Sequence, residues 1–504
     1  GVALHFDQCN DASGYHLFVK DLTTRLVDLG PYGQSSNGVL VEDSAGVTVL
    51  NSSFIGTQGS DIRAVGSCPK IMANHFEKRG AFGGLSPVGV WLEGCEEGVS
   101  RLASNRFKSK MTHAILAKSG QVEITGNYIE GTVTDFDDIN GPAIKVEDAK
   151  FTIEDNYLVG NQYAGIAVKG KTAKGDITGN RIEGTLGSDP GLKGGDGLIV
   201  LDCDPGPVII TGNSLVGNSR NGVLISGSIA KLENNLIKAT LKSQAPNVAP
   251  GAGLNVVEGS DALVRGNIFD GNYGHGARFG ESYGLVEGNV IAGTISAGDG
   301  VCSGGISAMD SLMGKGIINN LISGNQVAGI FLSNTSVDAI SGNIIDQTIQ
   351  GEGSLGTGIV AFGATLNIAE NWIRGNHDTG AYLDTPVGSA VANIFQSNGT
   401  GGAGGGLIVT GAEKMPFDIE GNTFTDNGFA GLVVSSSQFE AVKNAFVDNA
   451  PNEGGVGGVG AWIQNEAEGA LRLNYVADNQ TAGFYAFAAN DVTMATNYIT
   501  DTMV

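Results

Sequence analysis

The sequence predicts an all-β solenoid, a fold in which one chain winds through about 18 similar turns of short strands. A triplet of Asn, any residue and a large apolar residue recurs along the chain in 18 copies, and Ser takes the place of Asn once. The spacing between copies alternates without exception between 22–24 and 28–33 residues. Gly and Asn make up 80 and 40 of the 504 residues and separate apolar stretches of three to five residues, which is typical of short strands joined by tight turns.

The repeated triplet places a tight turn between two strands. Its third residue is always Phe, Ile, Leu or Val, from Phe54 to Ile499, and the residue three positions before the Asn is always apolar. Asn suits the turn because it tolerates the left-handed backbone conformation, so we expect the Asn itself to adopt it. The copies start at Ser52, Asn74, Asn105, Asn127, Asn156, Asn180, Asn213, Asn235, Asn267, Asn289, Asn320, Asn343, Asn371, Asn393, Asn422, Asn444, Asn474 and Asn497.

The triplets that open a short repeat followed by a long one carry two further signals. Seven triplets are followed by a second Asn five residues on and by a Gly nine residues on, and each Gly precedes a short, mostly apolar stretch. A repeat of about 22 residues accommodates three short strands, which form one turn of a coil. The extra residues of the longer repeats fall at the same point of the turn, so we expect a row of loops along one edge. These loops include residues 134–140, 187–195, 244–251, 297–304, 351–356, 400–405 and 451–457.

This pattern resembles the right-handed parallel β-helix of the pectate-lyase-like superfamily, including its asparagine ladder. Identical amides stacked on parallel strands form hydrogen-bonded ladders of this kind. The resemblance covers residues 37–504, and residues 1–36 are expected to form an N-terminal segment or a partial first turn. It implies the fold but not one function, because lyases, hydrolases, epimerases, tailspikes and adhesins share this architecture.

The composition excludes two classes of partner. The formal charge is −23, with 29 Lys and Arg against 52 Asp and Glu, whereas binding to nucleic acid requires a basic surface. No apolar run reaches the roughly 18 residues of a membrane-spanning helix. Charged residues make up only 16% of the chain and hydrophobic residues 41%, which is too apolar for a disordered chain, because disorder requires low hydrophobicity as well as net charge. We therefore expect a folded chain with no nucleic-acid partner and no transmembrane span.

The middle residue of each triplet is expected to point outward, because side chains alternate between the two faces of a strand. In the first seven copies it is mostly polar, and in the last four it returns to a mixed set. In the seven copies between them it is always large and apolar, and such a patch marks an interface. The alternative is that a loop or tail of the same chain covers it. The predicted interface residues are Leu236, Ile268, Val290, Leu321, Ile344, Trp372 and Ile394.

The end of the sequence suggests a second contact. It stops at residues 497–504 in the middle of a repeat, without a polar or helical cap. A coil with an open end exposes unpaired strand edges. We therefore expect a longer protein to continue from this point or another chain to cover it.

Acidic residues in the loops suggest a metal site. Asp135, Asp137 and Asp138 lie in one predicted loop, and calcium is bound by six to eight oxygen atoms in flexible acidic loops. The resemblance points the same way, since calcium assists polysaccharide lyases of this fold. The simpler interpretation is that an acidic protein carries scattered acidic residues on its surface. We therefore expect no required cofactor, with calcium as a possible ligand.

Four short motifs match catalytic or binding patterns but lie in the wrong context. Residues 165–172 match the phosphate-binding loop and residues 280–284 the nucleophile elbow, yet both chemistries need a following helix where this chain returns to its repeat. Residues 378–380 match the aspartic-protease triplet without a second carboxylate. The motif Gly274-His275-Gly276 is similar to one of polygalacturonases, but the surrounding aspartates are missing, so we interpret His275 as a surface residue.

The five cysteines fit neither a disulfide framework nor a zinc site. Cys68 and Cys95 each follow a strand by one or two turn residues in adjacent repeats. Stacked turns about 5 Å apart allow a disulfide. We therefore expect these two cysteines to be bonded, while Cys203 and Cys302 have no such neighbour.

The favoured function is that of a structural or adhesive protein of the bacterial cell surface or extracellular space. It would associate with itself or with another surface protein, and carbohydrate is a further possible partner. This hypothesis is favoured over an enzyme because catalytic β-helices usually carry a few large, unequal loops around a cleft, whereas the loops here are similar in length. Five threonines on alternate repeats, beginning at Thr132, are too sparse for an ice-binding or mineral-binding lattice.

The alternative is a calcium-assisted polysaccharide lyase, epimerase or glycosidase. Such an enzyme needs two or three carboxylates and a cation on neighbouring turns, close enough for proton transfer. The best candidates are the aspartates between residues 135 and 204, including Asp189, Asp196, Asp202 and Asp204, together with Arg181 and Lys193.

Overall fold

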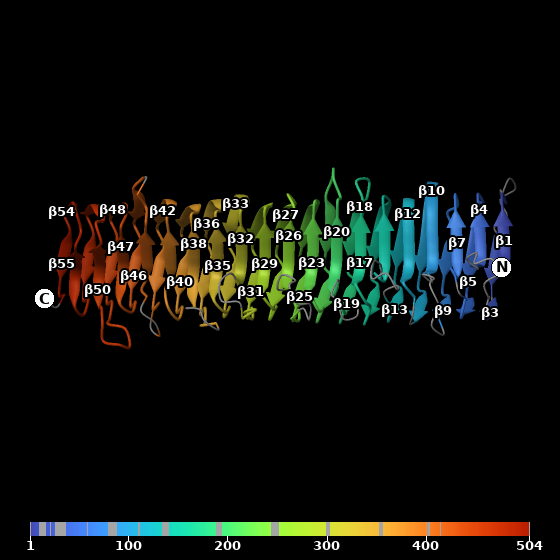
Figure 1. Cartoon of the computed structure of the whole chain (residues 1–504), viewed down its shortest axis with the longest axis horizontal. Coiled ribbons are helices and arrows are strands. Elements are labelled where there is room, and N and C mark those ends of the chain that lie inside the picture. The colour runs from blue at the N-terminus through green and yellow to red at the C-terminus, as the bar shows by residue number, and fades with distance from the viewer. Residues whose placement is uncertain are drawn as a thin grey trace. The chain divides into compact units, whose positions relative to one another are not determined.

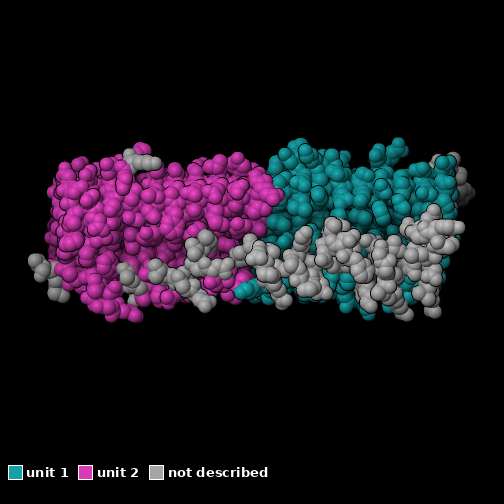
Figure 2. All heavy atoms as spheres, in the orientation of Figure 1, with its two compact units in different colours: residues 1–254 teal, residues 255–504 magenta. Residues whose placement is uncertain are grey.

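The computed structural model describes residues 2–9, 17–20, 22–25, 37–57, 59–78, 88–108, 111–133, 141–187, 194–242, 251–298, 303–351, 356–399, 401, 404–413 and 415–502. These residues form 55 strands and no helix, which confirms the predicted all-β solenoid (Figure 1). Contacts divide the chain into two compact units, unit 1 with residues 1–254 and unit 2 with residues 255–504 (Figure 2).

Within each unit, every turn of the coil contributes one strand to each of three parallel sheets. A strand of the first sheet leads through corner 1 to the second sheet, through corner 2 to the third sheet, and through corner 3 to the next turn. In unit 1 the first sheet contains β1 (Val2–Asp7), β4 (Asn37–Glu42), β7 (Ile62–Val65), β14 (Ile144–Glu147), β17 (Ala164–Lys169), β20 (Asp196–Leu201) and β23 (Asn221–Ser226).

The long strands β10 (Val88–Ala103) and β12 (His113–Thr125) run through corner 1 and belong to both the first and the second sheet. The other strands of the second sheet in unit 1 are β2 (Leu17–Lys20), β5 (Val47–Leu50), β8 (Lys70–Met72), β15 (Lys150–Glu154), β18 (Lys174–Thr178), β21 (Val208–Thr211) and β24 (Ile229–Glu233). The third sheet contains β3 (Thr23–Arg25), β6 (Ser53–Ile55), β9 (His75–Glu77), β11 (Arg106–Lys108), β13 (Tyr128–Glu130), β16 (Tyr157–Val159), β19 (Arg181–Glu183), β22 (Ser214–Val216) and β25 (Leu236–Lys238).

Unit 2 repeats the same order, and β26 (Ala252–Val257) contains the division between the units. Its first sheet contains β29 (His275–Gly280), β32 (Gly304–Met309), β35 (Ala328–Ser333), β38 (Thr357–Phe362), β41 (Ala381–Asp384), β44 (Leu407–Thr410), β47 (Ala430–Ser435), β50 (Val459–Gln464) and β53 (Ala482–Phe487). Its second sheet contains β27 (Asp261–Arg265), β30 (Tyr283–Glu287), β33 (Leu312–Ile318), β36 (Ser336–Ser341), β39 (Thr365–Ala369), β42 (Val387–Val391), β45 (Phe417–Glu420), β48 (Gln438–Val442), β51 (Glu468–Arg472) and β54 (Val492–Ala495).

The third sheet of unit 2 contains the shortest strands, each of three residues with the middle one inward. They are β28 (Ile268–Asp270), β31 (Val290–Ala292), β34 (Leu321–Ser323), β37 (Ile344–Asp346), β40 (Trp372–Arg374), β43 (Ile394–Gln396), β46 (Thr423–Thr425), β49 (Ala445–Val447), β52 (Tyr475–Ala477) and β55 (Tyr498–Thr500).

The predicted asparagine ladder forms at corner 2 in both units. Asn320 donates from its backbone N and from Nδ2 to Oδ1 of Asn343, at 2.9 and 3.0 Å. Asn343 in turn donates from Nδ2 to Oδ1 of Asn371 at 2.9 Å and to the carbonyl of Ile317 at 2.8 Å. Ser52 occupies the same corner and accepts from the backbone N of Leu22. The ladder thus gives buried backbone groups their partners.

The left-handed residue of the turn is the one before the ladder Asn, so the expectation that the Asn itself adopts this conformation was wrong. Gly342 has φ 64° and Glu370 has φ 56°, and the ladder Asn that follows each of them keeps a negative φ. The preceding residue turns the chain, which leaves the Asn side chain free to reach the next coil.

Two further ladders were not predicted. At corner 3, Asn376, Asn398, Asn427 and Asn449 bond in series, for example from Asn376 Nδ2 to Asn398 Oδ1 at 2.8 Å. Corner 1 uses hydroxyls, for example the backbone N of Ser44 donating to Ser67 Oγ at 2.9 Å. The threonines weighed above for ice binding, Thr132, Thr185, Thr240, Thr294 and Thr348, are at most 3% exposed at corner 3, so they form no surface lattice.

The core consists of inward residues that stack from coil to coil. In unit 2 the rings of Phe395, Phe424 and Phe446 stack with centroids 5.0 Å apart, and all three side chains are fully buried. Each coil therefore covers the apolar face of its neighbours, as in other solenoids.

The extra residues of the longer repeats all lie between a third-sheet strand and the next first-sheet strand. Most of them fall outside the part of the chain that the structure describes. Residues 451–457 are described and form a small hairpin, with an antiparallel bridge between Pro451 and Gly457.

Candidate functional site

The predicted apolar row lies on the outer face of the third sheet in unit 2. Its six residues occupy the first position of six neighbouring strands and pair residue to residue, so the row is continuous. Ile268, Val290, Leu321 and Ile394 are 45%, 37%, 38% and 43% exposed, and the other two are partly buried. We call this row, which consists of Ile268, Val290, Leu321, Ile344, Trp372 and Ile394, the third-sheet stripe.

Leu236, the seventh predicted residue, lies in β25 of unit 1 and is partly buried. Its neighbours in the same sheet are polar, since it pairs with Ser214, which pairs with Arg181. Within unit 1 it therefore belongs to no apolar row.

The third-sheet stripe has a nearly neutral border. The third positions of the same six strands are Asp270, Ala292, Ser323, Asp346, Arg374 and Gln396. Arg374 pairs with Asp346 at 3.2 Å and lies over the ring of Trp372, 3.9 Å from its centroid. Trp372 Nε1 donates to Gln396 Oε1 at 3.1 Å, so the ring is fixed on the sheet.

A second apolar row, which sequence reasoning missed, lies on the outer face of the first sheet in unit 2. It contains the middle outward residues of seven consecutive strands, paired in register. We call this row, which consists of Phe331, Val360, Tyr382, Ile408, Val433, Trp462 and Tyr485, the first-sheet stripe. Each member follows a Gly by two residues, and this spacing from the repeated Gly is the signal that could have found it.

Aromatic rings gather at both ends of the first-sheet stripe. Phe331, Phe362 and Tyr382 form a chain of rings with centroids 6.0 and 6.1 Å apart. Trp462 stacks on Phe429 at 5.0 Å and meets Tyr485 at 4.6 Å. Tyr485 and the neighbouring Phe362 are 41% and 38% exposed, and Tyr382 and Trp462 are partly exposed. Phe331 and Val433 are only 4% exposed, so these two members of the stripe offer little surface.

Polar side chains run beside the first-sheet stripe. The next outward position is polar and partly exposed on five of the seven strands, with Ser333, Asp384, Thr410, Ser435 and Gln464. It holds the exposed Phe362 and Phe487 on the other two. Burial raises the pKa of Tyr382, and the nearby Asp384 raises it further, so the phenol stays a neutral hydrogen-bond donor. The surface thus combines ring faces with donors and acceptors.

The sequence matches a family model over most of its length. A model described as the right handed beta helix region matches residues 32–182, 114–276, 172–336, 247–385 and 385–503. The chain belongs to this β-helix family. The resemblance inferred from the repeats is therefore confirmed.

Several solved structures are similar to this β-helix. They include the Dettilon tailspike protein (14% identity, 74% of this chain, TM-score 0.32), a mutant of the periplasmic alginate epimerase AlgG (10% identity, 95% of this chain and 84% of that chain, TM-score 0.26) and the A-module of the mannuronan C-5 epimerase AlgE6 from Azotobacter vinelandii (9% identity, 91% of both chains, TM-score 0.23). This chain spans 62% of the tailspike chain. At these identities the likeness concerns the fold alone. The search of curated proteins found no match.

The first sheet of unit 1 differs from that of unit 2 because charged side chains such as Arg63 and Lys145 interrupt its outward row. Trp91 lies between two cations, with the Arg63 guanidinium 4.9 Å and the Lys118 ammonium 5.6 Å from its ring. Lys118 and Lys145 both pair with Glu147, at 3.3 and 2.6 Å. The first sheet therefore carries an ion-pair network in unit 1 and an apolar stripe in unit 2.

The residues nominated for metal binding and catalysis are not brought together in the described part of the chain. Asp135, Asp137, Asp138, Asp189 and Lys193 lie outside the described residues, so the calcium site stays a prediction. Among the residues that are described, no three His, Cys, Asp or Glu side chains are placed to share a metal ion.

Two of the remaining candidates, Asp196 and Arg181, pair with other side chains. Asp196 is fully buried, pairs with the guanidinium of Arg220 and accepts from Asn221 Nδ2 at 2.8 Å. Arg181 pairs with Glu183 on the third sheet. Asp196 and Arg181 therefore do not form a catalytic acid–base pair.

His275 is buried, so its interpretation as a surface residue was wrong. It is 2% exposed at the start of β29, and its Nδ1 lies 2.8 Å from Ser307 Oγ. Burial, and to a lesser extent the charge of Arg278, lower the pKa of His275 to about 3. The ring is therefore neutral at physiological pH and cannot serve as a general acid.

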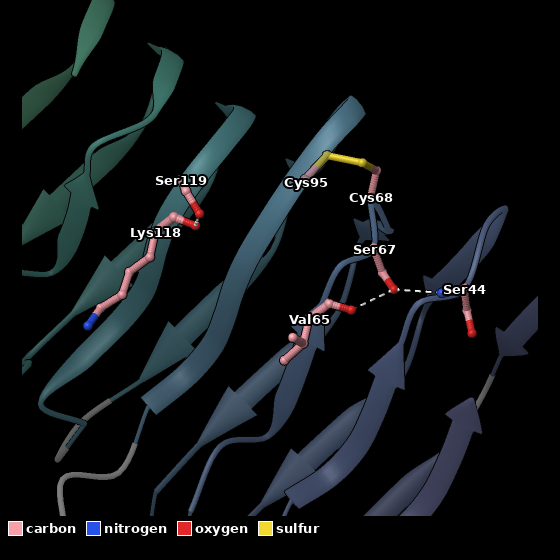
Figure 3. The surroundings of a disulfide bond; sticks show 7 residues. All are labelled: Ser44, Val65, Ser67, Cys68, Cys95, Lys118 and Ser119. Carbon is pink, nitrogen blue, oxygen red and sulfur yellow. Dashed lines mark hydrogen bonds between the residues drawn. A yellow bond between two sulfur atoms is a disulfide. The ribbon is translucent and has the colours of Figure 1, made fainter. Parts of the chain in front are cut away.

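The predicted disulfide between Cys68 and Cys95 is present, and it links adjacent coils at corner 1 (Figure 3). Its Cα atoms are 5.1 Å apart. Figure 3 shows the bond beside the hydroxyl ladder of Ser44 and Ser67. Cys203 is free and buried, and burial raises its pKa to about 11, so it is a poor nucleophile.

Unit 1 also contains a buried ion pair that the sequence did not suggest. Lys78 and Asp61 are 1% and 0% exposed. Lys78 Nζ donates to Asp61 Oδ1 at 3.0 Å and to the carbonyls of Thr57 and Gly59 at 2.7 and 2.9 Å. All three ammonium hydrogens have partners, so Lys78 fixes the corner between β6 and β7.

None of the described residues forms a helix that is long and apolar enough to cross a membrane.

Proposed function

We propose that this β-helix is an extracellular or cell-surface protein with a structural and adhesive role, and that the first-sheet stripe of unit 2 is its adhesive surface. The observation that carries this proposal is the register of the stripe, which aligns seven apolar side chains, five of them partly or well exposed, with aromatic rings near both ends. The ligand is a polysaccharide, because sugars present apolar C–H faces to rings and hydroxyls to the polar side chains beside them.

The charge of the surface favours a neutral polysaccharide. From β35 to β53 the stripe and the polar row beside it contain one charged side chain, Asp384, and no Lys or Arg. The whole chain carries −23, so a polyanion such as alginate is repelled. A neutral chain avoids this repulsion and can lie along several coils at once.

Rigidity supports an adhesive role. The backbone under the stripe is a continuous parallel sheet, and the asparagine ladders hold corners 2 and 3. The stripe is therefore held in shape before any ligand arrives, which reduces the entropy lost on binding.

The first prediction concerns Trp462 and Tyr382. Replacing either by Ala removes one ring from the stripe, and we expect affinity for hydroxyethyl cellulose to fall about tenfold, the equivalent of about 1.4 kcal/mol. Affinity electrophoresis of the full chain in gels with and without the polymer measures this loss. Alginate gels serve as the anionic comparison and should retard the wild-type chain less.

Matched controls separate the stripe from aromatic residues elsewhere. Tyr283, 49% exposed on the second sheet, and Trp372 on the third sheet are replaced by Ala in the same way. Both control variants should keep wild-type retardation. Equal loss in variants and controls, or no retardation of the wild type by any neutral polymer, would contradict the proposal.

A further inference from the structure

We propose that the third-sheet stripe of unit 2 is a homotypic interface, through which two copies of this chain pair side by side around a two-fold axis. This inference does not depend on the proposed function, because it concerns another sheet and another partner.

The chemistry of the stripe favours protein over sugar. Five of its six side chains are aliphatic, and the ring of Trp372 is covered on one face by Arg374 at 3.9 Å. Aliphatic groups offer no ring face for stacking on a sugar, whereas they pack well against other aliphatic groups. The stripe therefore differs from the first-sheet stripe in the partner it suits.

Charge singles out a second copy as the occupant. Two copies of a chain with charge −23 repel each other over most of their surface. The six strands of the stripe carry only three charged side chains, Asp270, Asp346 and Arg374, and the last two neutralise each other. In unit 1 the same sheet carries charged residues on many strands, for example Arg106 and Arg181. The stripe is thus a face on which two copies approach with little repulsion.

The regular spacing of the stripe residues also favours a second copy as the partner. Each member pairs with its neighbour in the next strand, so the row is a regular ridge with the strand spacing of about 4.8 Å. A second copy offers a ridge of identical period. A two-fold axis between Leu321 and Ile344 places Ile268 of one copy opposite Ile394 of the other. Such an isologous contact closes as a dimer and does not propagate.

The size of the stripe predicts a weak dimer. Six large side chains at the observed exposures present on the order of 300–400 Å², which is within the range of the largest apolar patch on a typical monomer. Stable complexes bury about 800 Å² per partner. Ile295 and Ile349, each 46% exposed, follow β31 and β37 and extend the apolar surface. We therefore expect association that rises with concentration rather than a permanent dimer.

Sedimentation velocity of the full chain over a range of concentrations tests the proposal. The wild type should shift from monomer to dimer, and the shift should grow with salt because salt screens the repulsion between acidic copies. The variant with Leu321→Asp and Ile344→Asp places four carboxylates at the axis and should stay monomeric. The control variant with Leu312→Asp and Val387→Asp, at residues 49% and 39% exposed on the second sheet, should dimerise as the wild type does.

Cross-linking of two mixed variants tests the geometry of the dimer. This test does not require the fold to tolerate Asp at the interface. Ile268→Cys and Ile394→Cys are made separately in a background with Cys9→Ser, and the two variants are mixed under oxidation. The mixture should give a disulfide-linked dimer, and neither variant alone should do so. A wild type that is monomeric at every concentration overturns the proposal. Dimerisation that survives the two Asp substitutions, or loss of hydroxyethyl cellulose binding in the same variant, overturns it as well.

Discussion

Replacing Lys78 by Met is expected to destabilise the coils around β6 to β9 by about 3–5 kcal/mol. The substitution leaves Asp61 fully buried without a cation and removes the donor from the carbonyls of Thr57 and Gly59. Loss of one partner of a buried pair is costly because the remaining charge is still desolvated. The effect is local, since each coil is stabilised mainly by its neighbours.

Hydrogen exchange followed by mass spectrometry measures this loss coil by coil. Peptides that cover β6 to β9 should exchange faster in Lys78→Met, while peptides of unit 2 keep their rates. The double variant with Asp61→Asn and Lys78→Met removes both charges and should recover part of the protection. Lys443 forms an exposed pair with Glu420, so Lys443→Met is the control and should change little. Unchanged exchange in Lys78→Met would show that the buried pair does not hold the corner.

The effect of Lys78→Met should depend on pH. Burial raises the pKa of Asp61 to about 6, although the charge of Lys78 opposes this shift. The folded state therefore holds this proton more tightly than the unfolded chain. The contribution of Asp61 to the free energy of unfolding is largest below about pH 4 and falls as the pH rises through about 6. Without Lys78 the pKa rises further, so the variant should lose more stability at about pH 8 than at about pH 4.

Replacing Asn343 by Ala should destabilise the middle of unit 2 by at least about 3 kcal/mol, since each buried polar group left without a partner costs about 1–3 kcal/mol. Asn343 Oδ1 accepts from the backbone N and from Nδ2 of Asn320, and its own Nδ2 donates to the carbonyl of Ile317. Ala removes all of these bonds and offers none in return. The damage should spread to both neighbouring coils.

A Ser substitution at the same position provides a graded comparison. Ser52 shows that a hydroxyl at this corner accepts from the preceding coil, through Leu22 N, and donates to the carbonyl of Leu50. Asn343→Ser should therefore cost less than Asn343→Ala in thermal unfolding and in hydrogen exchange of β34 and β37. Asn367 is exposed on the second sheet, and Asn367→Ala is the control that should change little. If Asn343→Ala matches this control, the ladder contributes no stability.

The repeat was readable from the sequence because its physical causes are local. The triplet from Asn320 to Ile322 contains the ladder amide, the outward residue and the core residue in three successive positions. This spacing predicted the corner 2 ladder, and alternation along the strand predicted which of these side chains point outward. The inference that the outward row is an interface goes beyond the spacing and stays a proposal.

The missed features have causes that a linear pattern does not contain. The ion pair of Lys78 and Asp61 connects two adjacent coils, and a Lys side chain is rarely buried unless it is paired. The sequence does not show which residues lie close enough to pair with it. The first-sheet stripe was overlooked because its members, such as Tyr382 and Trp462, stand outside the Asn triplet and are defined only by their distance from a Gly. The hydroxyl ladder at corner 1 uses Ser, Thr and other small residues in varying sequence contexts, so no repeated letter marks it.

One experiment tests the binding role of the first-sheet stripe most directly. It measures, in the same sample, how much hydroxyethyl cellulose the chain binds and how long the polymer chains remain. The full chain is incubated with the polymer, with and without calcium, and the bound polymer is recovered and sized. We expect polymer bound by the wild type, polymer largely unbound by Trp462→Ala, and unchanged chain length in both. Polymer that is shortened, or that binds Trp462→Ala as tightly as the wild type, would contradict an adhesive stripe.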